Sequence, residues 1–123
     1  MEATGMSEYT MAIIINSSLK MSAGKTAAQV AHGAVQAALQ AEAVRSEVLT
    51  RWLQQGGRKI CLQTDSLEVL GDLQQKATKR RIQSLEIRDA GLTEIPAGSL
   101  TVVVLGPGSK AKIEKITSQL QLY

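Results

Sequence analysis

The chain has 123 residues, 44% of them apolar, and a formal net charge of +3. This length and apolar content are typical of one globular domain and exclude a disordered chain, and no apolar stretch approaches the roughly 20 residues that a transmembrane helix needs. The single cysteine, Cys61, excludes an internal disulfide and a zinc site built on several cysteines. Because it lies in the apolar run Ile60-Cys61-Leu62, we interpret it as a small buried hydrophobe rather than a reactive thiol.

The first residues of the chain are mixed in character. They lack the basic start and the apolar centre of a signal peptide, so secretion is not indicated and we expect a cytoplasmic protein. We predict a flexible tail over residues 1–8 and one domain over residues 9–123.

An apolar, β-branched run predicts a buried strand over 10–15. Asn16-Ser17-Ser18 ends this strand, and Ser22 is the expected N-cap of a helix over about 23–40. The helical period of 3.6 residues gives this helix two distinct faces. The polar stripe consists of Lys25, Gln29, His32 and Gln36. The face expected to pack on a sheet consists of Ala28, Ala31, Val35, Ala38 and Leu39.

The rest of the chain alternates helical and extended patterns. In chain order we predict a helix over 43–55, a strand over 59–63, a helix capped by residues 64–66 and ending near 79, a strand over 82–88, a loop over 90–98, a strand over 100–105 closed by Gly106-Pro107-Gly108, and a helix over 109–120. Because the end of the 82–88 strand alternates apolar and polar residues, we place it near a sheet edge. Strands separated by helices indicate a three-layer α/β/α fold with a small, mostly parallel sheet.

Polar side chains gather in the loops that leave two of the predicted strands. If these strands run parallel, the loop with Lys20 and the loop with Asp89 and Thr93 leave the same edge of the sheet, where ligands bind in such folds. The pattern therefore predicts a polar site. Its candidate members are Lys20, Lys25, Gln29, His32, Asp89 and Thr93. A solvated lysine, a turn-capping aspartate and a structural histidine are the alternative interpretations.

Two kinds of chemistry lack support in these motifs. Gly24-Lys25-Thr26 is similar to the end of a nucleotide phosphate loop, but that loop needs a glycine where this chain has Leu19. A metal site would need more ligands near His32, and the predicted helix offers no carboxylate before Glu42. His32 is therefore a candidate for acid, base or hydrogen-bonding work rather than for metal ligation.

The positive charge is clustered, most densely at Lys76, Lys79, Arg80 and Arg81. Clustered cations attract phosphate backbones, so this group is a candidate contact for nucleic acid. Aromatic residues make up only 2% of the chain, so stacking platforms for bases are not expected and phosphate contact and shape should dominate.

Several motifs, in order along residues 9–123, resemble those of the type-2 peptidyl-tRNA hydrolases of archaea and eukaryotes. They are Leu19-Lys20-Met21, Gly24-Lys25, Ala27-Ala28-Gln29 with His32, Trp52 with Gly56, Arg88-Asp89-Ala90-Gly91-Leu92-Thr93, Pro96-Ala97-Gly98-Ser99, Thr101, Gly106-Pro107-Gly108, Lys115-Ile116-Thr117 and Leu120-Gln121-Leu122-Tyr123. The resemblance implies hydrolysis of the ester that joins a peptide to the terminal ribose of tRNA. It also implies a four-stranded mixed sheet between helices, a homodimer, and no metal or organic cofactor.

The residues that the resemblance carries over by position are Lys20, Lys25, Gln29, His32, Asp89, Thr93 and Thr101, and we assign their roles on chemical grounds. We expect Asp89 to orient or deprotonate a water or the Thr93 hydroxyl, and Lys20 to stabilise the oxyanion. The expected catalytic residues are Lys20, Asp89, Thr93 and His32, and the expected substrate and tRNA contacts are Lys25, Gln29, Thr101, Lys76, Lys79, Arg80 and Arg81. The alternative function is a non-catalytic RNA-binding or adaptor module on the same fold.

Overall fold

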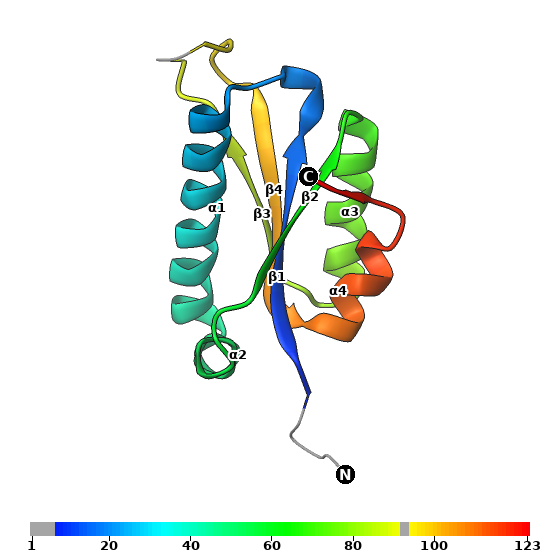
Figure 1. Ribbon diagram of the computed structural model, residues 1–123. Helices are drawn as coiled ribbons and strands as arrows, with labels where there is room; N and C mark the ends of the chain where they lie inside the picture. The colour runs from blue at the N-terminus through cyan, green and yellow to red at the C-terminus, as the bar shows by residue number, and fades with distance from the viewer. Residues whose placement is uncertain (1–6, 92–93) are drawn as a thin grey trace.

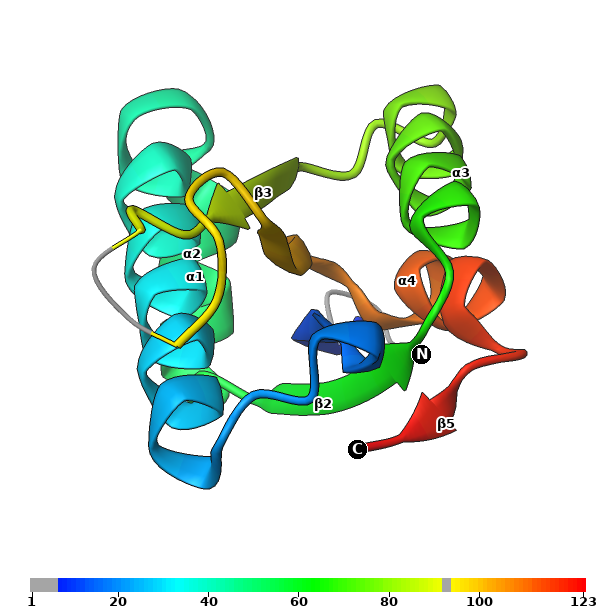
Figure 2. The same cartoon turned by 90° about the horizontal axis from the view of Figure 1, so that it is seen from above.

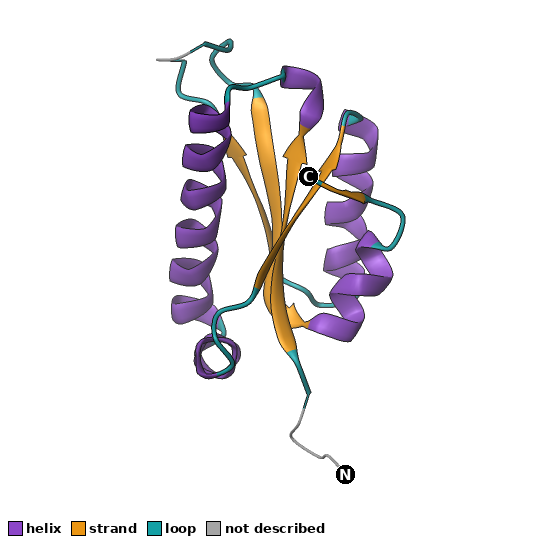
Figure 3. Ribbon diagram, in the orientation of Figure 1, coloured by secondary structure: helices purple, strands orange, loops and turns teal. Residues whose placement is uncertain are grey.

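The computed structural model describes residues 7–91 and 94–123, which form one five-stranded sheet with four α-helices (Figures 1 and 3). The strand order is β3-β4-β1-β2-β5. In chain order the elements are β1 (Tyr9–Asn16), the short 3-10 helix η1 (Ser17–Leu19), α1 (Ala23–Val44), α2 (Ser46–Gln54), β2 (Lys59–Thr64), α3 (Leu67–Lys79), β3 (Ser84–Arg88), β4 (Leu100–Ser109), α4 (Lys110–Thr117) and β5 (Gln121–Leu122).

Strand β1 lies in the middle of the sheet and is buried on both faces, as its apolar run predicts. Its side chains alternate between two apolar clusters because successive residues of a strand point to opposite faces. Met11, Ile13 and Ile15 belong to one cluster, and Ala12 and Ile14 belong to the other.

The helices lie on both sides of the sheet. Figures 1 and 2 show α1 and α2 on one side and α3 and α4 on the other. Trp52 of α2 packs with Met11, Ile13 and Ile15 of β1, while Leu70 of α3 packs in the opposite cluster. The indole of Trp52 is 2% exposed and donates a hydrogen bond to the Arg58 carbonyl, so this residue is part of the core.

Two features of the predicted sheet are wrong. The sheet has five strands rather than four, because the two residues of β5 pair with β2 after the last helix. It is also not mostly parallel: only β1 and β2 run parallel, and the other three pairings are antiparallel. A parallel connection needs a crossover element, usually a helix, and residues 89–99 between β3 and β4 contain none among those described.

Strand β4 also extends beyond its predicted end. Gly106-Pro107-Gly108 lies within the strand instead of closing it, since Thr10 pairs with Gly108 and Tyr9 with Ser109. Near this segment the pairing with β1 shifts register, which accommodates the glycine–proline run in the ladder.

Helix α1 turns a different face to the sheet from the predicted one. Of the residues expected to pack on the sheet, Val35 is 59% exposed and Leu39 is 60% exposed. The residues buried instead are Thr26, Gln29, Gly33, Ala37 and Ala41. The small side chains at Gly33, Ala37 and Ala41 let the helix approach β4 closely, where Val35 and Leu39 would be too bulky to fit.

Gly33 marks the closest approach, and replacing it by alanine should destabilise the protein by about 1 kcal/mol. A Cβ here would lie 2.8 Å from the Val104 Cγ2 and 3.2 Å from the Val102 Cγ2. Overpacking typically costs about 1–3 kcal/mol, and the better helix propensity of alanine offsets up to about 1 kcal/mol of this. Urea denaturation followed by circular dichroism measures the change. Gly24→Ala is the matched control, because a Cβ there meets nothing within 4 Å. Equal effects at the two glycines would contradict the packing argument.

Three other features bear on the expectations above. Cys61 is half-buried, and this burial raises the pKa of its thiol above the ordinary value, which disfavours the reactive thiolate. Most of the predicted tail lies outside the described residues, but Glu8 forms ion pairs with Arg58 and Lys110. Across the described part of the chain, no helix combines the length and apolar character needed to cross a membrane.

Candidate active site

The loops after β1 and β3 meet at one edge of the sheet. Both strands are antiparallel to β4, so they run parallel to each other and their carboxyl ends lie at the same edge, as predicted. Ser22, in the first loop, donates hydrogen bonds to Glu94 in the second, from its backbone N–H at 2.6 Å and from its hydroxyl at 2.9 Å. These bonds, the backbone one first, lower the pKa of the Glu94 carboxyl below its ordinary value.

Asn16 and Ser22 fix the course of the first loop. The buried Asn16 side chain donates to the Leu100 carbonyl at 2.9 Å and accepts from the Ser18 backbone N–H at 3.1 Å. Ser22 caps α1 by accepting from the Lys25 N–H at 3.2 Å, as its sequence position predicts. Lys25 therefore lies in the first turn of α1, beside the β3–β4 loop.

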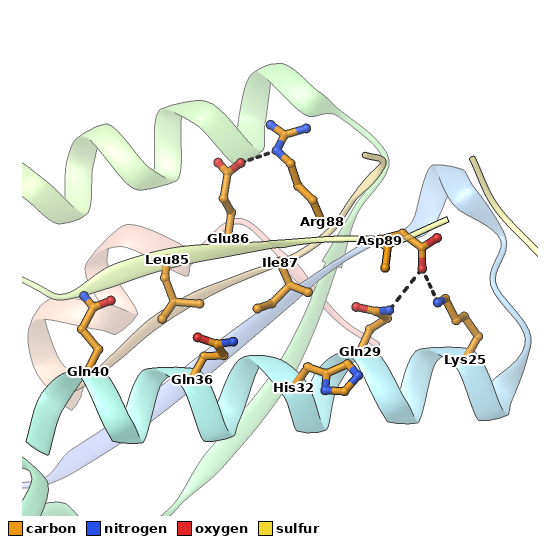
Figure 4. A pocket seen from close by; sticks show the side chains of 11 residues that line it. Lys25, Gln29, His32, Gln36, Gln40, Leu85, Glu86, Ile87, Arg88 and Asp89 are labelled. Carbon is orange, nitrogen blue, oxygen red and sulfur yellow. Dashed lines mark hydrogen bonds and ion pairs between the residues drawn. The ribbon is translucent and has the colours of Figure 1, made fainter. Parts of the chain in front are cut away.

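Asp89 directly follows β3 and is only 4% exposed. Its Oδ1 pairs with the Lys25 ammonium and lies 3.5 Å from the Gln29 Nε2, while its Oδ2 accepts from the Gly91 N–H at 2.8 Å (Figure 4). Its backbone is anchored to the start of β4 through the Ser99 carbonyl and the Gly98 N–H. A buried carboxylate needs such donors because an unpaired buried charge is costly.

Gln29 connects Asp89 to the core of the sheet. The Thr101 hydroxyl, which is fully buried in β4, donates to the Gln29 Oε1 at 3.0 Å. This bond turns the amide nitrogen of Gln29 toward Asp89. The result is a continuous polar chain from Thr101 through Gln29 and Asp89 to Lys25, between α1 and the sheet.

A cavity of about 670 Å³ opens between α1 and β3 from this polar chain. Figure 4 shows the polar stripe of α1 facing β3 across it. It is lined by Lys25, Gln29, His32, Gln36, Gln40, Leu85, Glu86, Ile87, Arg88, Asp89 and Ala90. The stripe read from the sequence is therefore one wall of a cavity, with Asp89 and Lys25 at the end nearest the two loops.

The structure brings together only part of the predicted site. Lys25, Gln29, His32 and Asp89 line the cavity. Lys20 is exposed, with a left-handed φ of 50° at the end of η1, and it does not line the cavity. Thr93 lies outside the described residues.

The predicted tRNA contacts fall into two groups. Gln29 and Thr101 are buried within the polar chain. The basic cluster is exposed at and just beyond the C-terminal end of α3, on residues Lys76, Lys79, Arg80 and Arg81.

The arrangement suits proton transfer or the orientation of a water rather than metal chemistry. A carboxylate held by an ammonium and an amide, at the end of an open cavity, can accept a hydrogen bond from a water or a substrate hydroxyl. No three His, Cys, Asp or Glu side chains are grouped to hold a metal ion within residues 7–91 and 94–123.

Sequence reasoning missed the residues that join the loops. The residues around Glu94 in the sequence do not indicate its role, because its partner Ser22 is 72 residues away in the chain. The prediction for Asn16 was only that it ends a strand. A polar residue at the end of a buried strand is also a candidate anchor for the loop that follows.

Comparison with known proteins agrees with this fold. A solved structure of a protein of unknown function from Agrobacterium tumefaciens strain C58 superposes with a TM-score of 0.59 and 12% identity, covering 96% of this chain and 99% of that one. At this identity the likeness shows the fold alone.

Sequence relatives are much closer. A peptidyl-tRNA hydrolase from Thermococcus sibiricus is 43% identical over 117 residues, covering 95% of this chain and 99% of the relative. Another from Staphylothermus marinus is 43% identical over 115 residues, with 94% and 95% covered. The family model described as "Peptidyl-tRNA hydrolase PTH2" matches residues 9–123. The chain therefore belongs to the PTH2 family of peptidyl-tRNA hydrolases.

Proposed function

We propose that this protein hydrolyses the ester between the peptide and the terminal ribose of peptidyl-tRNA, and so returns tRNA to translation. The observation that carries the proposal is the buried Asp89 carboxylate, held by Lys25 and Gln29 at the end of an open cavity in a chain of this family. A partner-binding module would have no need of a desolvated carboxylate at a cavity wall. The proposal places the enzyme in the cytoplasm, where the substrate is formed.

In this mechanism Asp89 orients and activates the group that attacks the ester carbonyl. That group is a water or the hydroxyl of Thr93, which lies outside the described residues. The Lys25 ammonium pairs with the Asp89 carboxylate and donates a charge-assisted hydrogen bond that holds it in place. His32, on the exposed part of the same wall, contacts the adenosine or the ester carbonyl.

Gln29 and Thr101 act through Asp89 rather than by touching tRNA. Their burial, at 4% and 0% exposed, leaves them little surface for a large substrate. Their hydrogen bond fixes the amide that faces Asp89, so they hold the carboxylate in place. In the three-layer α/β/α arrangement that we propose for this family member, they join the α1 layer to the sheet at the site.

The direct test is an assay of the purified protein on N-acetyl-aminoacyl-tRNA, with release of deacylated tRNA followed on acid gels. We expect turnover with wild-type protein, and equal turnover in the presence of EDTA. Tight binding of the tRNA without ester cleavage would contradict hydrolysis and favour the non-catalytic RNA-binding module.

Lys20 is proposed as the oxyanion stabiliser, and the variant Lys20→Asn tests it. Asparagine removes the ammonium but tolerates the left-handed φ of 50° at this position, so the loop should keep its course. Loss of one oxyanion stabiliser typically lowers turnover about a hundred- to a thousandfold. We expect such a loss in kcat with an unchanged melting temperature. A kcat at the wild-type level in this variant would leave the oxyanion to another group.

We also propose that the protein is a homodimer, joined through the exposed apolar face of α1 and α2. Val35 and Leu39, one helical turn apart on α1, and Leu53 on the neighbouring α2 are each more than half exposed, and contiguous exposed apolar surface marks sites of protein association. Trp52 of α2 is not part of this face, because its indole is buried in the core. Val35→Glu should convert a dimer to a monomer in analytical ultracentrifugation, and a wild-type monomer would contradict the proposal.

A further inference from the structure

The cavity beside Asp89 continues along α1 into a second cavity of about 300 Å³. The two adjoin at Gln40, which lines both, and at the start of β3, where Leu85 lines the first and Ser84 the second. The second cavity is lined by Gln40, Val44, Arg45, Thr78, Arg81, Ile82, Gln83 and Ser84. We call the two together the α1–β3 groove. It runs from the carboxylate of Asp89 at one end to the guanidinium groups of Arg45 and Arg81 at the other.

The groove changes character along its length. Its middle is neutral and amide-rich, with the exposed Gln36 and Gln40 on α1 facing β3 (Figure 4). At the near end, the Lys25 ammonium already pairs with Asp89. At the far end, Arg45 donates to the neutral Arg81 carbonyl at 2.7 Å, and in the described ranges neither arginine forms an ion pair with a carboxylate.

We propose that the α1–β3 groove holds the unpaired 3′ end of the tRNA, with the basic residues at its far end on the phosphates of the acceptor stem. The inference rests on the proposed function, because it requires the ester to lie at Asp89. Arg81 is both a wall of the groove and a member of the basic cluster, so the groove leads from the site directly to that cluster.

The dimensions and chemistry of the groove fit this occupant. From Lys25 to Gln40 the helix rises about 22 Å, and a stacked RNA strand advances roughly 3.4 Å per nucleotide, so several nucleotides fit between the site and the basic end. Neutral amides donate and accept hydrogen bonds with base edges and ribose hydroxyls of unpaired nucleotides. Unpaired cations at the far end are suited to phosphates and have no role in binding a peptide of arbitrary sequence.

A peptide is the competing occupant, because β3 is an edge strand. The Gln83 carbonyl accepts a hydrogen bond from the Gly106 N–H of β4. In an antiparallel pair, the backbone N–H and C=O groups of successive residues point alternately toward and away from the partner strand, so those of Ser84 and Glu86 point away from β4. An extended peptide could pair there. The experiment therefore varies the RNA end and the peptide separately.

The test measures binding of deacylated tRNA, labelled at its 5′ end, by fluorescence anisotropy. Each protein is titrated with the full tRNA and with the same tRNA lacking its unpaired 3′ nucleotides. The proteins are the wild type, Gln36→Ala/Gln40→Ala, and the matched control Gln119→Ala/Gln121→Ala, whose exposed glutamines lie near β5 at the opposite edge of the sheet. Circular dichroism confirms that each variant is folded.

We expect truncation of the RNA to weaken wild-type and control binding about tenfold, but to weaken binding by the Gln36→Ala/Gln40→Ala protein much less, because only the contact of His32 with the terminal adenosine is then lost. Equal or equally undetectable binding of the two RNAs by the wild type would overturn the proposal. A Gln36→Ala/Gln40→Ala variant that loses as much affinity on truncation as the wild type would also overturn it. A variant whose KM rises further as the peptide lengthens, while its RNA affinity is unchanged, would assign the groove to the peptide. Binding needs no ester cleavage, so failure of the hydrolytic function is seen separately in the wild-type assay.

Discussion

Asp89→Asn should lower kcat for peptidyl-tRNA roughly a hundred- to ten-thousandfold, with a much smaller change in KM. Asparagine keeps the size of the side chain but cannot accept a proton, and proton transfer by a positioned side chain contributes a factor of this order. The amide oxygen can keep the hydrogen bond from the Gly91 N–H at the Oδ2 position, whereas the amide nitrogen then takes the Oδ1 position beside Gln29 and Lys25. The measurement is single-turnover and steady-state cleavage of N-acetyl-aminoacyl-tRNA.

The variant leaves the Lys25 ammonium without its buried partner, so its folding must be measured as well. The Lys25 side chain is 9% exposed, and an orphaned charge there should lower the melting temperature. The double variant Lys25→Met/Asp89→Asn removes both charges and should recover stability without recovering activity. Asp72→Asn, at an exposed position on α3, is the matched control. Wild-type turnover in a folded Asp89→Asn protein would exclude this carboxylate from catalysis.

Charge reversal at Lys79 and Arg80 should raise KM for tRNA substrates about tenfold or more and leave kcat largely unchanged. Both residues are exposed at the C-terminal end of α3, next to Arg81 in the wall of the α1–β3 groove. Each lost phosphate contact reduces the salt dependence of binding by about one unit of slope, so Lys79→Glu/Arg80→Glu should flatten the plot of log KM against log salt by about two.

Lys112→Glu/Lys115→Glu provides the control for this experiment. It changes the net charge by the same amount on exposed positions of α4, and Lys115 lies in the last turn of its helix as Lys79 does. The cost to the helix dipole is therefore matched at Lys115 and Lys79, but Lys112 lies in the first turn of α4 and Arg80 is the C-cap of α3, so circular dichroism checks the folding of both double variants. If both double variants raise KM equally, the effect is one of overall charge and the cluster at α3 is no specific contact.

The local pattern of the chain predicted most elements correctly because each depends on neighbouring residues. The apolar run of β1, the Ser22 cap of α1 and the alternation in β3 are all present near their predicted positions. The predicted edge position of β3 is confirmed by the strand order. The stripe from Lys25 to Gln36 was likewise visible, since it follows from helical spacing alone.

The face of α1 that contacts the sheet could not be read from hydrophobicity. A count of apolar residues favours Val35 and Leu39, whereas the structure buries Gly33 and Ala37. The choice depends on how closely the helix can approach Val102 and Val104, which is a property of two surfaces and not of one.

By itself, the amino-acid pattern determined the α/β class of the fold, the polar helix stripe and the basic cluster, and its ordered motifs pointed to the family. Only the tertiary structure decided the antiparallel course of β4, the pairing of Asp89 with Lys25, and the groove that joins the site to Arg81. The physical reason is the separation along the chain of the residues that each feature depends on. Helical and strand periodicity arises within a few residues, whereas an ion pair between residues 64 apart exists only after two loops have been brought to the same edge of a sheet.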